Sequence, residues 1–319
     1  MGCNSLPFFS PRRAKVRIGI SGGTQTLWRY LVRKRETLLT PLRRDIELRT
    51  LNTEAELRQA FVDGQLDIAA TLPPAVPSLA QSDIDAQFFL PVSWIREGFM
   101  FITGVESPVR SMSDLVGQSV AIYPLSHPGF AYWLAFLLKN YGISIQQMNY
   151  RETERPEASI QAAEVVAACV GSSQWSTLKM SQRYRKISDL SEEWRKISKS
   201  DELLMFGGYM ARSGFIQDNR GFIDDFVGVN YDVLRAYKTD RNAFLEAISE
   251  EEAGPNLTRE QNESIAWYLG LDDVDPGRMY ISDRDVRSYE EVFTLLADAG
   301  YLRKPLPEVN TLFYRSQRR

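Results

Sequence analysis

Hydrophobic and polar residues follow regular local periods along the first third of the chain. Alternation with a period of two marks strands at residues 16–20 and 45–51, and a short apolar run marks a buried strand at 66–70. Helical spacing of apolar residues marks helices at 26–37 and 53–63 between these strands. Strands that alternate with helices predict an α/β fold, in which a mostly parallel sheet is covered on both faces.

The same alternation starts again after Gly104. The second set of predicted elements comprises strands at 119–123, 146–151 and 165–170, and helices at 129–140 and 159–164. The pattern therefore predicts two α/β lobes of similar plan. The length of 319 residues agrees with this, since a domain typically has about 150 residues.

The last third of the chain is mainly helical. One more apolar strand is expected at 204–212, and it is followed by predicted helices at 219–237, 241–249, 258–269 and 288–299. The segment 183–200 is dense in charged residues, so we expect it to form a solvated helix or loop.

Composition removes several classes of function. With 38 Lys and Arg against 41 Asp and Glu, the net charge of -3 gives no reason to expect nucleic-acid binding. The single histidine, His127, excludes a multi-histidine metal site, and two cysteines cannot form a cysteine metal knuckle. The loop around Gly22 and Gly23 has neither dinucleotide nor P-loop spacing. We therefore expect no metal and no cofactor.

Catalytic and membrane-spanning signals are also weak. Ser126 and His127 are adjacent, but no carboxylate lies close in sequence to orient the imidazole, so His127 is interpreted as a loop or cleft residue. Cys169 lies within an apolar strand and is expected to be a small buried hydrophobe. The longest apolar run, 130–138, is less than half of the roughly 20 residues that a membrane span needs.

Four loops at the carboxyl ends of predicted strands are rich in hydroxyls and glycines. They lie at 21–25, 71–74, 125–129 and 171–175, and none contains Lys or Arg. Ligands of open α/β sheets bind at these strand ends, where free N–H groups and the positive end of a helix dipole suit a small anion. For each loop taken alone, a helix N-cap is the favoured interpretation. Four equivalent loops in two lobes favour a shared ligand cleft.

Several segments carry a family resemblance. Residues 57–69 form a helix followed by Gly, two residues, Asp and an apolar strand. Residues 107–121 contain an Asp-Leu-x-Gly-x-x-Val phrase, and the loop with Ser126 precedes a long helix that ends at Tyr141-Gly142-Ile143. Residues 288–302 fit a final helix with a Gly-aromatic exit. In these features the chain resembles the periplasmic type II solute-binding proteins of ABC importers, of the nitrate, sulfonate and taurine type, which are related to pyrimidine-precursor binders.

The chain departs from this family in two loops that line the family's cleft. The usual Gly-x-Val-Asp-Ala of the second lobe is replaced at 163–168 by a segment that has neither the glycine nor the aspartate. The first loop, 21–26, also differs from the family's usual polar and aromatic arrangement. These departures put the inherited ligand in doubt.

The resemblance implies two lobes that are joined by two crossovers and close around a ligand by a hinge motion. The crossovers are expected near 101–105 and 203–208. Residues 1–14 would form a flexible tether, residues 15–103 with 206–319 the first lobe with the C-terminal helices, and residues 104–205 the second lobe.

The function implied by the resemblance is capture of a small anionic or zwitterionic molecule, similar to a sulfonate, taurine or nitrate, for delivery to an ABC permease and ATPase. No enzymatic step is expected, and we expect a monomer. The expected ligand-binding residues are Ser21, Gly22, Thr24, Gln25, Thr71, Ser126, His127, Ser172 and Trp175.

The resemblance also gives the amino terminus a meaning. Cys3 follows a small residue, as does the lipidated cysteine of a lipoprotein signal. A diacylated Cys3 would hold the protein at the periplasmic or extracellular face of the membrane.

Two other classes of function remain open at this stage. One is an enzyme of the same fold that acts on a pyrimidine or menaquinone-pathway precursor, although one histidine and two cysteines argue against it. The other is a sensor module that binds a ligand but no longer serves transport.

Overall fold

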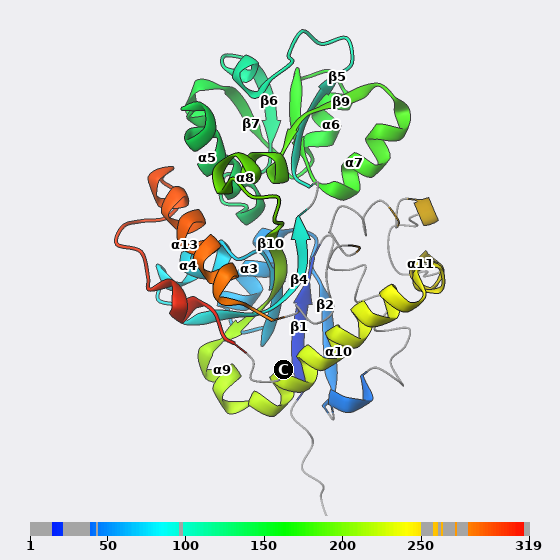
Figure 1. The fold of residues 1–319 in the computed structure, drawn as a ribbon, viewed down its shortest axis with the longest axis vertical. Helices are drawn as coiled ribbons and strands as arrows, with labels where there is room; N and C mark the ends of the chain where they lie inside the picture. The colour runs from blue at the N-terminus through cyan, green and yellow to red at the C-terminus, as the bar shows by residue number, and fades with distance from the viewer. Residues whose placement is uncertain are drawn as a thin grey trace, which may run out of the picture.

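The computed structural model describes residues 15–21, 39–42, 44–95, 98–249, 258–260, 263, 272 and 280–315. These residues form two α/β lobes stacked along the long axis of the molecule (Figure 1). The predicted helix at 26–37 and most of the one at 258–269 lie outside the described residues.

The sheet of the first lobe has the strand order β2-β1-β3-β10-β4. β1 pairs in parallel with β2 and β3, and β10 is antiparallel to both β3 and β4, so four of these five strands run in one direction. The strands are β1 (Val16–Ile20), β2 (Ile46–Thr50), β3 (Ile68–Thr71), β4 (Ala86–Ile95) and β10 (Leu204–Arg212).

The second lobe repeats this plan with the order β7-β6-β8-β5-β9. Here β5 is the reversed strand, antiparallel to β8 and β9. The strands are β5 (Met100–Gly104), β6 (Ser119–Ile122), β7 (Asn149–Glu152), β8 (Ala167–Val170) and β9 (Tyr184–Asp189). The predicted fold of two α/β lobes with mixed, mostly parallel sheets is therefore confirmed.

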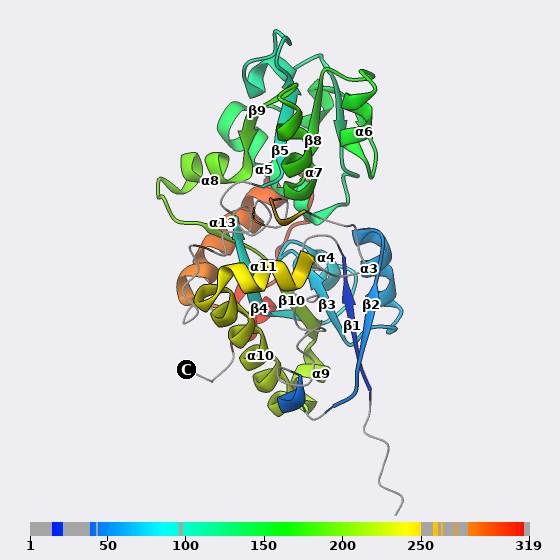
Figure 2. The ribbon, with the colours of Figure 1, turned by 90° about the vertical axis from the view of Figure 1, so that its right-hand side faces the viewer.

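Helices cover both sheets. In Figure 2, α3 lies on one side of the first lobe and α10 on the other. The first lobe has η1 (Thr40–Leu42), α3 (Glu54–Val62), α4 (Ala75–Ala80), α9 (Ser213–Asp218), α10 (Arg220–Thr239), α11 (Arg241–Ser249), α13 (Asp283–Asp298) and η6 (Val309–Leu312). The second lobe has η2 (Met112–Leu115), α5 (Pro128–Tyr141), η3 (Ile145–Gln147), α6 (Pro156–Gln161), α7 (Ser172–Leu178), η4 (Lys179–Ser181) and α8 (Leu190–Ser198).

The lobe boundary differs from the expected one. β5 belongs to the second sheet, so the first crossover lies between Ile95 and Met100 rather than at 101–105. The second crossover lies between Ser198 and Leu204, just before the expected 203–208. The physical reason is that β4 and β5 are both almost wholly buried. The apolar pattern therefore continues from one lobe into the next.

Aromatic side chains fill the junction of the lobes. The Phe99 ring lies 5.5 Å from the Tyr123 ring of the second lobe and 5.6 Å from the Phe206 ring of the first. On the side of α5 and α13, the Tyr132 and Tyr289 hydroxyls are 2.7 Å apart, and Tyr289 also donates to the Met205 carbonyl. This packing holds the two sheets together across the crossovers.

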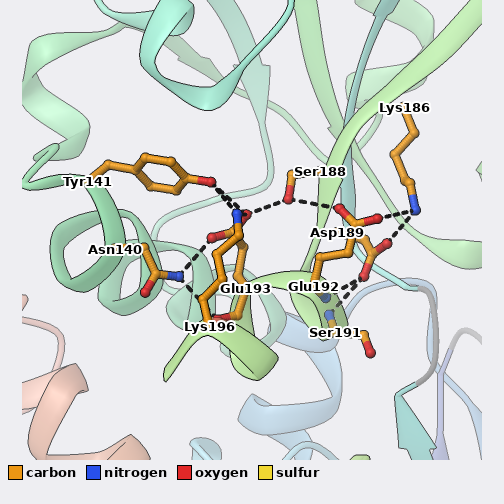
Figure 3. A network of polar contacts seen from close by, with 9 residues as sticks. All are labelled: Asn140, Tyr141, Lys186, Ser188, Asp189, Ser191, Glu192, Glu193 and Lys196. Carbon is orange, nitrogen blue, oxygen red and sulfur yellow. Dashed lines mark hydrogen bonds and ion pairs between the residues drawn. The ribbon is translucent and has the colours of Figure 1, made fainter. Parts of the chain in front are cut away.

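The charged segment 183–200 is not a solvated helix or loop. It forms β9 and α8, and Glu193 of α8 is fully buried. The Glu193 carboxylate accepts hydrogen bonds from Asn140 Nδ2 at 2.7 Å, Tyr141 OH at 2.8 Å and Ser188 Oγ, and pairs with Lys196 at 2.8 Å (Figure 3). The expectation from the sequence is wrong because the charge of Glu193 is neutralised inside the protein, where its carboxylate links α5, β9 and α8.

Replacing Glu193 with alanine is expected to destabilise the protein by about 3 kcal/mol, because the buried donors lose their acceptor and Lys196 loses its partner. Urea unfolding of the variant measures this loss. Glu291→Ala, on the exposed side of α13, is the control and should change the free energy of unfolding by less than about 0.5 kcal/mol. Equal effects of the two substitutions would contradict the structural role of Glu193.

Candidate functional site

Two cavities lie at the junction of the lobes. The interlobe cavity, of about 410 Å³, receives side chains from both lobes. Its polar lining includes Glu54, Arg58, Ser126, His127, Glu154 and Tyr301. The hinge cavity, of about 460 Å³, lies at the second crossover and is lined among others by Trp94, Trp194, Asp201, Glu202, Arg284 and Tyr289. Among the described lining residues, those of the predicted site belong to the interlobe cavity.

Glu54 connects the interlobe cavity to the strand ends of the first lobe. It lies in the first turn of α3, and its carboxylate accepts hydrogen bonds from Thr71 Oγ1 at the end of β3 and from Ser21 Oγ after β1, the latter at 3.2 Å. Glu54 as a residue is half-buried, but protein surrounds its carboxyl group. This burial raises the pKa of Glu54 to about 7, although the hydrogen bonds from Thr71 and Ser21 oppose the rise.

Arg58 and Tyr301 supply further polar groups to the cavity. Arg58 lies one turn after Glu54 in α3, and its guanidinium donates to Ser78 Oγ at 3.0 Å. Tyr301 follows α13, and its hydroxyl lies 3.4 Å from the Ser126 carbonyl oxygen of the other lobe. Burial raises the pKa of Tyr301 to about 12, so its hydroxyl is a neutral hydrogen-bonding group at physiological pH.

His127 forms part of the second lobe's wall. Its Nδ1 accepts the Gly129 N–H at 3.0 Å and thereby caps α5. The ring packs 5.5 Å from Phe99 and 5.1 Å from Tyr123, and burial lowers its pKa to about 4. The imidazole is therefore neutral at pH 7 and keeps its proton on Nε2. His127 can donate a hydrogen bond to a ligand, and its position as a cleft residue agrees with the sequence interpretation.

The structure separates the predicted site residues into groups. Ser126 and His127 line the interlobe cavity, and Ser21 and Thr71 reach it through Glu54. Trp175 is buried in an apolar cluster of the second lobe with Met100 and Ile102. Ser172 begins α7 at the end of β8, and Trp175 is not among the described residues that line the cavity. Gly22, Thr24, Gln25 and Cys3 lie outside the described residues. Cys169 is confirmed as a fully buried free cysteine.

Sequence reasoning missed Glu54, Arg58, Glu154 and Tyr301. Glu54 and Arg58 are spaced four residues apart, which places both on one side of α3 and was the available signal. Glu154 follows β7, and Tyr301 follows α13, far from any predicted strand end. No pattern along the chain indicates that these two residues meet.

Within the part of the chain that the structure describes, no three His, Cys, Asp or Glu residues gather as a metal site. Among the described helices, none has both the length and the apolar composition that crossing a bilayer requires.

Two lobes, two crossovers and a cavity between the lobes define a hinged ligand-binding protein. Residues 30–246 match the family model described as ABC transporter, phosphonate, periplasmic substrate-binding protein. The chain belongs to this family. It is therefore an extracytoplasmic substrate-binding component of an ABC importer, which binds a small-molecule ligand and acts with the transporter complex. No curated protein matches the chain in sequence.

Solved structures share the fold at low sequence identity. The alkanesulfonate-binding protein SsuA from Xanthomonas axonopodis pv. citri, bound to MOPS, has a TM-score of 0.71 and 16% identity, with 96% of this chain and 99% of that chain covered. The aliphatic sulphonate-binding protein SsuA from Escherichia coli has a TM-score of 0.71 and 14% identity, with 97% of this chain and 94% of that chain covered. A Candida albicans protein described as having the generic periplasmic binding protein fold has a TM-score of 0.69 and 11% identity, with 96% of this chain and 98% of that chain covered.

Stability is expected to depend on pH through Glu54. The folded-state pKa of Glu54, about 7, exceeds its ordinary value of 4.5. The contribution of protonated Glu54 to the free energy of unfolding is therefore at its full value below pH 4.5 and is lost as pH rises through 7. Glu54→Gln removes the titration. We expect the stability of the variant relative to the native protein to increase by roughly 2–3 kcal/mol between pH 5 and pH 8.5. Urea unfolding at both pH values measures the change, and a pH-independent difference would contradict it.

Proposed function

We propose that the interlobe cavity is the ligand site and that its ligand is a small acid of the phosphonate or sulfonate kind. The observation that carries this proposal is that one cavity takes polar side chains from both lobes, so a bound ligand would bridge them and favour closure. The family description names phosphonate, and the SsuA structures are described as binding sulfonates. Arg58 offers the acid a charged partner, and His127 offers a neutral donor.

The proposal extends to the remaining expected features. Ser21 and Thr71 contribute by orienting Glu54, while Gly22, Thr24 and Gln25 are proposed to complete the cleft from the loop after β1. We propose that the protein is monomeric, performs no chemical step, and is anchored through a lipid on Cys3. The Nδ1 lone pair of His127 is occupied by the Gly129 N–H, and burial lowers the pKa of the imidazole to about 4, which supports the absence of general-base chemistry at this position.

Thermal unfolding with alkylphosphonates, alkanesulfonates, taurine and nitrate tests the proposed function. A true ligand at 100 times its dissociation constant stabilises the protein by about 2.7 kcal/mol and raises the melting temperature. Arg58→Met is expected to weaken binding of that ligand at least tenfold, since the acid loses its charged partner.

Arg195→Met is the matched control for Arg58→Met, because Arg195 lines the hinge cavity instead. It should leave the affinity unchanged. Loss of binding in Arg195→Met with full binding in Arg58→Met would place the ligand in the hinge cavity and refute the assignment. Chemical conversion of a bound probe would favour an enzyme.

A further inference from the structure

Phe99, in the first crossover, has an unusual backbone conformation. Its φ of 49° lies in the left-handed region, which is costly for a bulky L-residue because the Cβ crowds the following carbonyl oxygen. Among the described residues, the other non-glycine residues with positive φ come just after helices, where this conformation is ordinary: Asp83, Ala163, Gln182 and Lys199. Phe99 instead lies between β4 and β5, so the end of a helix does not explain its conformation.

A residue that takes this conformation without strain lies directly before Phe99. Gly98 is a glycine, and glycine adopts the left-handed region at no steric cost. The crossover nevertheless places the phenylalanine there. Strained residues persist where the surrounding packing holds them, and they gather at ligand clamps and switch regions. The contacts of Phe99 must therefore compensate for its strained backbone.

Phe99 contacts both lobes. Its ring centroid lies 5.5 Å from those of Tyr123 and His127 in the second lobe, and 5.6 Å from that of Phe206 in β10 of the first. The Phe99 carbonyl also accepts the indole N–H of Trp133 at 3.0 Å. Groups of both lobes thus hold one residue of the crossover, so its left-handed conformation depends on how the lobes are placed.

Gly129 makes room for the Phe99 ring. A Cβ at Gly129 would lie 2.6 Å from the Phe99 ring and 3.0 Å from the His127 ring, so one of them would have to shift. The same glycine donates its N–H to His127 Nδ1 at 3.0 Å. Phe99 and Gly129 therefore fix the imidazole together. Because His127 lines the interlobe cavity, Phe99 is separated from that cavity by one side chain.

We propose that Phe99 is a positioning residue that couples the interlobe cavity to the first crossover. Its ring holds the His127 imidazole in the wall of the cavity, and the same packing keeps its backbone in the left-handed region. When His127 moves to meet a ligand, or when the lobes turn, this packing is lost and the backbone relaxes. The placement of His127 and the arrangement of the lobes therefore change together. This role rests on the proposed function, which places the ligand beside His127.

NMR titration of the imidazole measures the contact between Phe99 and His127. His127 is the only histidine of the chain, so its ring signals identify it in the untagged protein. Burial lowers its pKa to about 4, and the charged residues of the cavity, Glu54, Arg58 and Glu154, are not the cause. The native imidazole should therefore stay neutral between pH 5 and pH 8. Phe99→Leu removes the ring contact, so its imidazole should titrate in this range, with a pKa at least one unit higher.

Spin labels report the arrangement of the lobes without a ligand. Gln65 of the first lobe and Gln161 of the second are exposed, and each is replaced by a labelled cysteine. Cys3 is replaced by serine, and the other native cysteine is fully buried. Electron–electron double resonance then gives the distribution of distances between the lobes. Phe99→Leu and Gly129→Ala, which displaces the ring, should each broaden this distribution or add a second population.

Phe215→Leu is the matched control. Phe215 is also a partly buried phenylalanine beside another ring, that of Phe222, but it belongs to α9 of the first lobe. It should leave both the His127 titration and the label distances unchanged. The double variant Phe99→Leu/Gly129→Ala separates the proposed fit from general damage. Leucine leaves space for the new Cβ, so Gly129→Ala should add little to the effect of Phe99→Leu.

The outcomes decide the coupling independently of the ligand. An unchanged His127 titration in Phe99→Leu refutes the contact, and a shifted titration with unchanged label distances refutes the coupling. Additive effects of Phe99→Leu and Gly129→Ala also refute it, because the ring and the glycine would then act separately. Equal changes in Phe215→Leu would show general loosening and overturn the assignment. If no phosphonate or sulfonate probe binds the native protein, the proposed function fails, whereas the titration and the label distances still decide the coupling.

Discussion

The pairing of β10 with β3 and β4 is the constraint on which the two-lobed structure depends. Among the described strands, β4 pairs only with β10, which the chain reaches after it has completed the whole second lobe. The contact is also tight, since a Cβ added at Gly208 would collide with the Leu90 carbonyl. The first lobe therefore cannot complete its sheet until the chain has crossed twice. The double crossing keeps the strand ends of both lobes facing a common junction, where the interlobe cavity forms.

Packing at this junction is divided between apolar and polar sides. Phe99, Tyr123 and Phe206 join the lobes through aromatic contacts, and Tyr132 with Tyr289 adds a buried hydrogen bond between α5 and α13. The interlobe cavity is instead lined by charged groups, and a hydrogen bond from the Tyr301 hydroxyl to the Ser126 carbonyl joins the lobes there. Apolar packing therefore joins the lobes beside the crossovers, and the polar cavity is the place where the proposed ligand would bridge them.

Much of this arrangement was predictable from the sequence, because local periodicity reports burial. β1 and β10 have the predicted bounds, and α5 differs from its prediction by one residue at each end. Periodicity could not locate the crossover after β4, since apolar residues continue through it, nor recognise that the charge of Glu193 is neutralised by Lys196. The site was only partly predictable. Ser21, Thr71, Ser126 and His127 follow from the strand-end rule, whereas Tyr301 reaches the cavity only through tertiary packing.

Glu54 links the strand ends of the first lobe to the interlobe cavity. A carboxyl held at the ends of β1 and β3 by Ser21 and Thr71 has hydrogen bonds for its charge, yet burial still raises its pKa to about 7. Hydrogen bonds from neutral hydroxyls therefore compensate the desolvation of the carboxylate only in part. The positive charge of Arg58, one turn away, also lowers the pKa of Glu54, but burial remains the larger effect. The first lobe thus keeps an incompletely compensated acid at the place where the two lobes meet. Because Glu54 lines the interlobe cavity, any group that occupied this cavity would change the surroundings of its carboxyl and therefore its pKa.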